Sequence, residues 1–156
     1  MDTVIALMLL ALLAGVVWYN RMDNSQQHER DTVRSEVRRF QQQISLQSAL
    51  AKVQPKERGY PETIDPEWFQ GNIPTHPMLD ASHPWLQVAG PDQKTLLHPP
   101  DPIAASNSIS KFWYNPYMGV VRARVPAGFS DAASLELYNY INDSQLTELF
   151  ADSTNK

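Results

Sequence analysis

The chain opens with an apolar run that is followed by a longer amphipathic segment. Residues 4–19, VIALMLLALLAGVVWY, carry no charge, and as an α-helix they would extend about 24 Å, against roughly 30 Å for the hydrocarbon core of a bilayer. Trp18 and Tyr19 suit the membrane interface, where aromatic side chains collect. We therefore expect a transmembrane anchor over residues 1–20 that contacts the lipid bilayer through residues 4–19. A cleaved signal peptide is the alternative, although Asp2 stands where such peptides carry Lys or Arg.

Beyond residue 20 the apolar positions become periodic. They recur at spacings of four, three, four and seven residues, which places them on one face of an α-helix. Leu46 and Leu50 are expected to widen that face, as a helix packed on a globular domain requires. Residues 21–54 are therefore predicted to form an amphipathic spine helix, continuous with the anchor and ended by Pro55. The periodic positions are Val33, Val37, Phe40, Ile44 and Ala51.

Arginine side chains recur on the same segment at every fourth position, at Arg30, Arg34 and Arg38. Such a stripe is usually the solvated face of a helix, and we adopt that interpretation. The alternative is that the stripe meets anionic lipid or an acidic partner. Ion pairs between residues three positions apart add a few tenths of a kcal/mol each to helix stability. The pairs expected here are Asp31 with Arg34 and Glu36 with Arg39.

Proline content divides the chain sharply. All 12 prolines lie at or after Pro55, and ten of them fall within residues 55–102, so this part of the chain is not expected to form long regular elements. Large apolar residues are scattered through the proline-rich segment, which indicates an ordered, loop-rich layer and not a disordered linker. We expect a head over residues 55–150 and a frayed tail over residues 151–156.

Short elements are expected inside the head. Asp65 and Pro66 suit the cap and the first position of a helical turn, and residues 85–89, WLQVA, indicate a short strand. Residues 130–142, SDAASLELYNYIN, begin with Ser and Asp and carry several apolar side chains, so a short helix is expected there. A further turn is expected over residues 143–150, DSQLTELF.

The most regular pattern of the head is a hairpin over residues 109–126. Alternation along ISKFWY and VVRARV is typical of a strand buried on one face. The PYMG turn between them fits a four-residue loop, with Asn115 accepting a hydrogen bond, Pro116 fixing φ and Gly119 in the left-handed region. Together the elements predict an α+β fold in which a long N-terminal helix, transmembrane and then amphipathic, packs on a small antiparallel sheet.

No catalytic, cofactor-binding or metal site is predicted, and no cofactor. The chain has no cysteine, which removes disulfides, thiolate nucleophiles and cysteine-based zinc sites, and it carries none of the common catalytic or phosphate-binding motifs. Three histidines each precede a proline, at His76, His83 and His98. Their spacings match no metal-ligand pattern, and a following proline favours extended loop positions. The net charge of −4 provides no global basic field, so no nucleic acid partner is expected.

The hairpin also carries the candidate partner-contact residues. Aromatic and arginine side chains dominate hot spots at protein interfaces, and here they flank a single turn. We expect Arg122 and Arg124 to point outward from the sheet. We expect the hairpin to be first a scaffold, with Phe112 or Trp113 packed on the spine helix, and a binding surface only on the outward face of Arg122 and Arg124. The candidate contact residues are Trp113, Tyr117, Arg122 and Arg124.

The layout of the chain resembles the pilin fold, in which a long helix, apolar first and amphipathic second, precedes a small α+β head. Tyr60-Pro61 after the helix and the late hairpin WYNPYMGVV are similar to features of type II secretion pseudopilins and other type IV pilin-like proteins. The resemblance covers roughly residues 3–126. The basic leader of that family, and the glutamate near the start of its helix, have no counterpart here.

This resemblance implies a structural or interaction protein of the bacterial envelope, without catalysis, that contacts other envelope or pilin-like proteins. It implies a single-pass anchor in the bacterial inner (cytoplasmic) membrane, with the head outside the cytoplasm. Five arginines follow the predicted anchor before Pro55 and none precedes it, so the positive-inside rule alone would place the head in the cytoplasm. The alternative function is a membrane-tethered ligand- or protein-binding module that uses the hairpin as its recognition surface.

Overall fold

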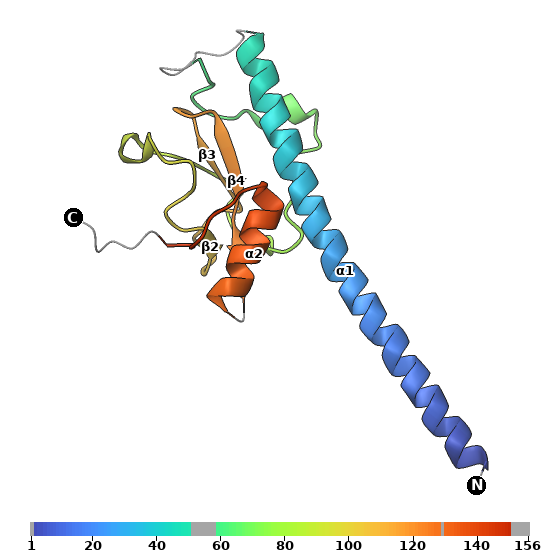
Figure 1. The fold of residues 1–156 in the computed structure, drawn as a ribbon. Helices are drawn as coiled ribbons and strands as arrows, with labels where there is room; N and C mark the ends of the chain where they lie inside the picture. The colour runs from blue at the N-terminus through green and yellow to red at the C-terminus, as the bar shows by residue number, and fades with distance from the viewer. Residues whose placement is uncertain (1, 51–58, 129, 151–156) are drawn as a thin grey trace.

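The computed structural model describes residues 2–50, 59–128 and 130–150, with all side chains in these ranges except those of residues 2–7, 9, 11, 20 and 23. The longest element is the helix α1 (Asp2–Ala49). Its C-terminal half lies against a small head, and its N-terminal half projects away from the head (Figure 1). This confirms the long N-terminal helix. The predicted helix end at Pro55 and the predicted frayed tail lie outside the described residues.

The described part of the head contains a second helix, two short 3-10 helices and five short strands. In chain order these are η1 (Pro66–Phe69), β1 (Leu86–Val88), η2 (Pro91–Gln93), β2 (Ile103–Ala104), β3 (Phe112–Asn115), β4 (Val120–Ala123), β5 (Val125–Pro126) and α2 (Asp131–Asn142). The turn after Asp65, the strand within residues 85–89 and the helix after Ser130 are therefore confirmed. The helical turn expected over residues 143–150 is wrong, because Asp143 ends α2 in the left-handed region at φ 48°.

Polar side chains begin both helical elements of the head. The Asp65 carboxylate accepts a hydrogen bond of 2.9 Å from the Glu67 N–H, and the Ser130 hydroxyl accepts one of 3.2 Å from the Ala133 N–H. Each bond satisfies a backbone donor that has no partner within its own helix. These caps place the start of η1 and α2 at positions that are visible in the sequence.

The strands form two small sheets, one mixed and one parallel. In the three-stranded sheet, β1 pairs in parallel with β3 and β3 pairs antiparallel with β4, while β2 and β5 form a separate parallel pair. The α+β class is therefore confirmed, but the prediction of a purely antiparallel sheet is wrong. A parallel pair requires the connecting segment to return to the end at which the first strand began. Residues 89–111 do this between β1 and β3, and residues 105–124, which contain the β3–β4 hairpin, do it between β2 and β5.

The hairpin forms at the predicted turn. Its register runs from Phe112 opposite Ala123 to Asn115 opposite Val120. The Asn115 side chain accepts a hydrogen bond of 3.0 Å from the Tyr117 N–H, and Gly119 has a φ of 64°, as the turn chemistry predicts. The paired region is shorter than residues 109–126, because β4 ends at Ala123 and β5 pairs with β2.

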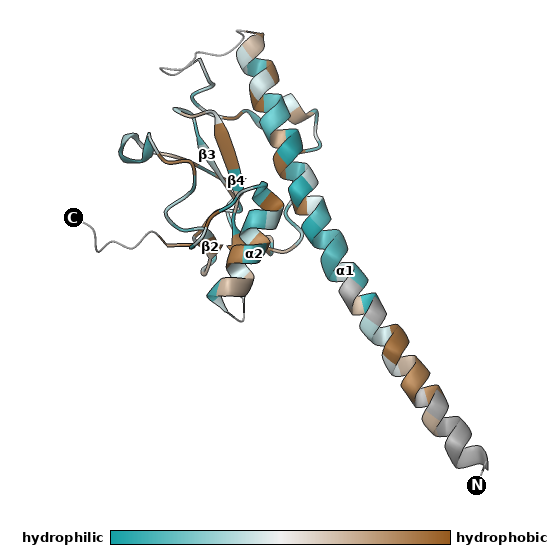
Figure 2. Cartoon of the chain, in the orientation of Figure 1, coloured by the Kyte–Doolittle hydropathy of each residue, from teal (hydrophilic) through white to brown (hydrophobic). Residues whose placement is uncertain are grey.

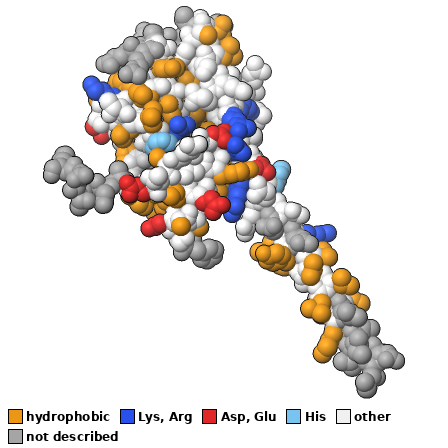
Figure 3. Space-filling view, in the orientation of Figure 1, with side chains coloured by type: hydrophobic (Ala, Val, Ile, Leu, Met, Phe, Trp, Pro, Cys, Tyr) orange, Lys and Arg blue, Asp and Glu red, His pale blue; other side chains and the backbone are white. Residues whose placement is uncertain are grey.

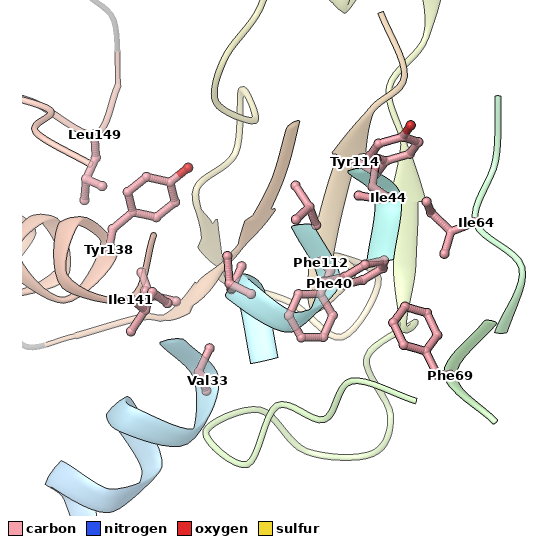
Figure 4. Packing of buried hydrophobic residues seen from close by; sticks show 14 residues of the cluster. Val33, Phe40, Ile44, Ile64, Phe69, Phe112, Tyr114, Tyr138, Ile141 and Leu149 are labelled. Carbon is pink, nitrogen blue, oxygen red and sulfur yellow. The ribbon is translucent and has the colours of Figure 1, made fainter. Parts of the chain in front are cut away.

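The core lies between the C-terminal half of α1, the sheet and α2. Four of the predicted face residues of α1 are buried among side chains from β3, β4 and α2 (Figure 4). They are Val33, Val37, Phe40 and Ile44, at most 6% exposed. Leu46 and Leu50 are 49% and 48% exposed, so the prediction that they widen this face is wrong. At about 100° per residue, Leu46 lies on the side of the helix away from Ile44.

Strand β3 is buried on both faces. Phe112 and Tyr114 belong to the core cluster beneath the helices, whereas Trp113 and Asn115 are covered from the other side by the loop that contains Gln93. The prediction of strands buried on one face is therefore wrong for β3. The run Phe112–Trp113–Tyr114 is apolar without alternation, which is consistent with burial on both faces.

The outer edge of β4 is closed by two side-chain amides. Gln41 of α1 donates to the Gly119 carbonyl at 2.6 Å and accepts from the Val121 N–H at 3.2 Å. Asn142 of α2 accepts from the Ala123 N–H at 2.8 Å and donates to the Ala123 carbonyl at 2.9 Å. These amides occupy backbone groups that another strand would otherwise pair with, so this edge is closed to further strands.

Within the described residues, no helix combines the length and apolar character needed to cross a membrane. The predicted transmembrane anchor over residues 1–20 and the single-pass inner-membrane location are therefore wrong. The uncharged run has 16 residues and is about 24 Å long as a helix, less than the roughly 30 Å of a hydrocarbon core. Figure 2 shows that strongly apolar positions of α1 are concentrated in its projecting half and give way to polar ones towards the head.

Candidate interaction surfaces

The projecting half of α1 exposes large apolar side chains. Nine of them between residues 8 and 22 are each 53% to 72% exposed, and Figure 3 shows them along the part of the helix that leaves the head. They form two shallow faces, one made by Leu12, Gly15, Val16 and Tyr19, the other by Leu10, Leu13, Ala14, Val17, Trp18 and Arg21. At about 100° per residue, these faces lie about half a turn apart on the helix. The helix is therefore apolar on opposite sides.

The arginine stripe of α1 holds α2 in place. Arg34 and Arg38 both pair with the Asp143 carboxylate, through Nε–O distances of 2.9 Å in each case. Hydrogen bonds from Arg38 and Arg34 lower the pKa of Asp143 below its usual value. The Arg34 guanidinium also lies 4.8 Å from the centre of the Tyr140 ring. The purely solvated interpretation is wrong for these two arginines, because their acidic partner is in the same chain.

One of the two expected ion pairs within α1 is present. Arg39 lies 2.7 Å from the Glu36 carboxylate, which confirms that pair. Asp31 does not bind Arg34 and instead accepts from the Tyr140 hydroxyl, because Arg34 is engaged by Asp143. The Asp31–Tyr140 bond and the Arg34–Asp143 pair tie the C-terminal end of α2 to the middle of α1, so the head is fixed on the helix at a defined position.

The four candidate contact residues do not form one exposed surface. Trp113 is fully buried and donates from Nε1 to the Gln93 side chain at 3.0 Å. Arg122 is half-buried beside Trp113 and donates from Nε to the Leu97 carbonyl at 3.2 Å. Tyr117 lies in the turn that joins β3 to β4. The outward orientation expected for Arg124 is wrong, since this residue is 1% exposed.

The buried Arg124 guanidinium lies at a cleft on the sheet face away from the helices. Its Nε donates to the Asp101 carbonyl at 2.7 Å, and its Nη1 donates to the Ser110 carbonyl at 3.1 Å. Nη1 also bonds the Ser110 hydroxyl, and Nη2 bonds the Gln87 amide oxygen. Burial lowers the pKa of Arg124 from its ordinary value. An arginine that alternates with apolar residues carries no sequence signal of burial, so this cleft was missed.

The three histidines each tie a loop to another element. His76 lies 2.8 Å through Nε2 from the Arg124 carbonyl, so this nitrogen carries the proton and donates. Burial lowers the pKa of His76 to about 4, and its Nδ1 is buried without a hydrogen-bond partner. His83 bonds the Ile109 carbonyl, and His98 bonds the Tyr138 hydroxyl. Among the described residues, no three His, Cys, Asp or Glu side chains are grouped closely enough to hold a metal ion.

The two sequence features that carry the family resemblance contact each other. Tyr60 lies against Gly119, where an added Cβ would overlap the tyrosine ring. The Tyr114 hydroxyl donates to the Pro61 carbonyl at 2.8 Å. The segment after the helix is therefore fastened to β3 and to the turn of the hairpin. The absence of a side chain at Gly119 is a packing requirement as well as a conformational one.

Comparisons with known proteins return nothing that identifies the chain: no family model, no curated protein and no solved structure matches it.

Proposed function

We propose that the protein is a non-catalytic structural subunit of pilin-like layout, which assembles with further copies of itself through the projecting half of α1. The observation that carries this proposal is the exposure of apolar side chains on opposite sides of that half-helix. Exposed apolar surface of this extent marks an interaction site, because covering it removes apolar area from water.

A second copy is the occupant that this helix fits best. A single partner helix covers one face of a helix and leaves the opposite face in water. A copy of the same chain has the same two apolar faces. Each added copy therefore covers one exposed face and leaves its own second face available to a further copy. Each face also combines a small residue, Gly15 or Ala14, with a large aromatic one, Tyr19 or Trp18. Identical helices can therefore set large side chains against small ones.

The head does not block packing of another helix on the projecting half of α1. The described residues of the head contact only the C-terminal half of α1 (Figure 1). Another helix can therefore lie along the projecting half without meeting this part of the head of the same chain. The edge of β4 is closed by the amides of Gln41 and Asn142, so that edge does not compete as a site for strand addition. In the proposed assembly, the head of each copy stays at a fixed position on its own α1.

Sedimentation velocity over a hundredfold range of concentration tests the proposal. Leu12→Gln/Val16→Gln alters one face, and Leu13→Gln/Val17→Gln alters the other. We expect concentration-dependent species larger than a dimer for the unaltered chain, smaller species for each double variant, and a monomer when all four changes are combined. Leu46→Gln is the matched control, because Leu46 is an exposed leucine on the half of α1 that carries the head. An unaltered chain that remains monomeric throughout would overturn the proposal.

A further inference from the structure

The Arg124 guanidinium is a buried charge whose bonds all go to neutral acceptors. Two are backbone carbonyls, one is a hydroxyl and one is the Gln87 amide oxygen. In the part of the chain that the structure describes, ion pairs within 4 Å form at Arg34, Arg38 and Arg39, and none forms at Arg124. A buried cation without a carboxylate in direct contact is costly, since neutral dipoles replace only part of its hydration. The Asp101 carboxylate acts on Arg124 only at longer range.

A cleft opens beside this charge. It has a volume of about 380 Å³ and is lined by both apolar and polar groups, which suits a small ligand and not a flat protein partner. Pro84, Leu86 and Ile109 form apolar lining, while Arg124, Gln87 and Ser110 supply hydrogen-bonding groups. Gln87 is exposed, so its side chain can leave the guanidinium without disturbing the core.

The charges at the cleft select the kind of anion. Asp101 also lines the cleft, and its negative charge repels a ligand with two negative charges, such as phosphate, more strongly than a ligand with one. A single carboxylate matches the planar donor edge of a guanidinium and forms stronger hydrogen bonds than a neutral amide oxygen does. The apolar lining adds a preference for an apolar substituent on the acid.

We propose that this cleft is a binding site for a small monocarboxylate with an apolar substituent. The ligand carboxylate displaces the Gln87 amide from the Arg124 Nη2 and leaves the bonds to Ser110 and Asp101 in place. Gln87 is thus a neutral placeholder: without ligand, its amide oxygen occupies the position at Arg124 Nη2 that the ligand carboxylate takes. The apolar part of the ligand lies along Leu86 and Ile109.

Calorimetric titration of the full chain with N-acetylleucine tests this proposal, with leucinamide and inorganic phosphate as comparison probes. We expect saturable binding of N-acetylleucine and none of leucinamide, which lacks the carboxylate. Phosphate should bind at least about tenfold more weakly. Equal binding of phosphate and N-acetylleucine, or binding of leucinamide, would overturn the proposal by showing that the cleft does not recognise a carboxylate.

Gln87→Glu is the decisive variant, because it changes one group and supplies Arg124 with a carboxylate from within the chain. We expect it to raise the melting temperature and to weaken N-acetylleucine binding at least about tenfold. Gln42→Glu adds the same charge at an exposed position of α1 away from the cleft, and it should leave binding unchanged. Gln87→Ala removes the placeholder and should tighten binding. Undiminished binding by Gln87→Glu refutes the site even if the other variants behave as expected.

Discussion

Protonation of His76 should destabilise the fold as the pH falls below neutrality. His76 is buried, its Nε2 donates to the Arg124 carbonyl, and its Nδ1 has no hydrogen-bond partner. A proton on Nδ1 would create a charge with no acceptor inside the head. Burial is the main reason that its pKa falls to about 4 in the folded chain, and the positive charges of Lys111 and His83 act in the same direction.

The sign and size of the effect follow from linkage. The unfolded chain has an ordinary histidine with a pKa near 6.5, so between about pH 6.5 and pH 4 the unfolded state binds the proton that the folded state excludes. Stability is therefore full above pH 6.5 and is lost as the pH falls. For this one group the loss is about 2 kcal/mol at pH 5 and about 3 kcal/mol at pH 4. His98 acts in the same direction, but its partial exposure reduces its contribution.

Urea unfolding of the unaltered chain and His76→Gln at pH 7.5 and pH 5.0 measures this effect. Glutamine can keep a donor near the Nε2 position but does not titrate, so the variant should lose about 2 kcal/mol less than the unaltered chain between the two pH values. His28→Gln is the control, because His28 is exposed on α1. If His76→Gln and the unaltered chain lose the same free energy of unfolding, the buried neutral state of His76 is refuted.

Two further substitutions test the packing of the hairpin by urea unfolding. Gly119→Ala should cost about 1–3 kcal/mol more than Gly71→Ala, because both glycines have positive φ but only at Gly119 would a Cβ meet the Tyr60 ring; equal costs would contradict that contact. Asn142→Leu should cost about 2–5 kcal/mol, because it leaves the N–H and carbonyl of Ala123 buried without partners. A cost below about 1 kcal/mol would show that this edge of β4 is not closed by Asn142.

Local signals in the sequence predicted the elements that depend on local chemistry. The helical periodicity of Val33, Val37, Phe40 and Ile44 identified the buried face of α1. Asp65 and Ser130 gave the starts of η1 and α2, and Asn115 with Gly119 gave the turn of the hairpin. In each case a residue type constrains the backbone or a helix face directly, without contributions from distant parts of the chain.

The features that depend on distant partners could not be predicted. Strand alternation predicts an outward orientation for Arg124, but Gln87 of β1 and the loop segments at Asp101 and Ser110 enclose it. Asp143 lies more than a hundred positions from Arg34 in sequence, and no local pattern links the two side chains. The exposure of Leu46 has a local cause: at about 100° per residue it lies on the side of the helix opposite Ile44, so the helical period alone accounts for it.

Single-cysteine cross-linking tests the central claim, that projecting helices of separate copies pack together. The chain has no cysteine of its own, so Val16→Cys introduces a single reactive group on one apolar face of α1. Thr95→Cys places the same group on the exposed surface of the head. With a short bis-maleimide, we expect Val16→Cys to give covalent dimers at low micromolar concentration and Thr95→Cys to remain monomeric. Dimer yields for Val16→Cys no higher than those for Thr95→Cys would contradict assembly through α1.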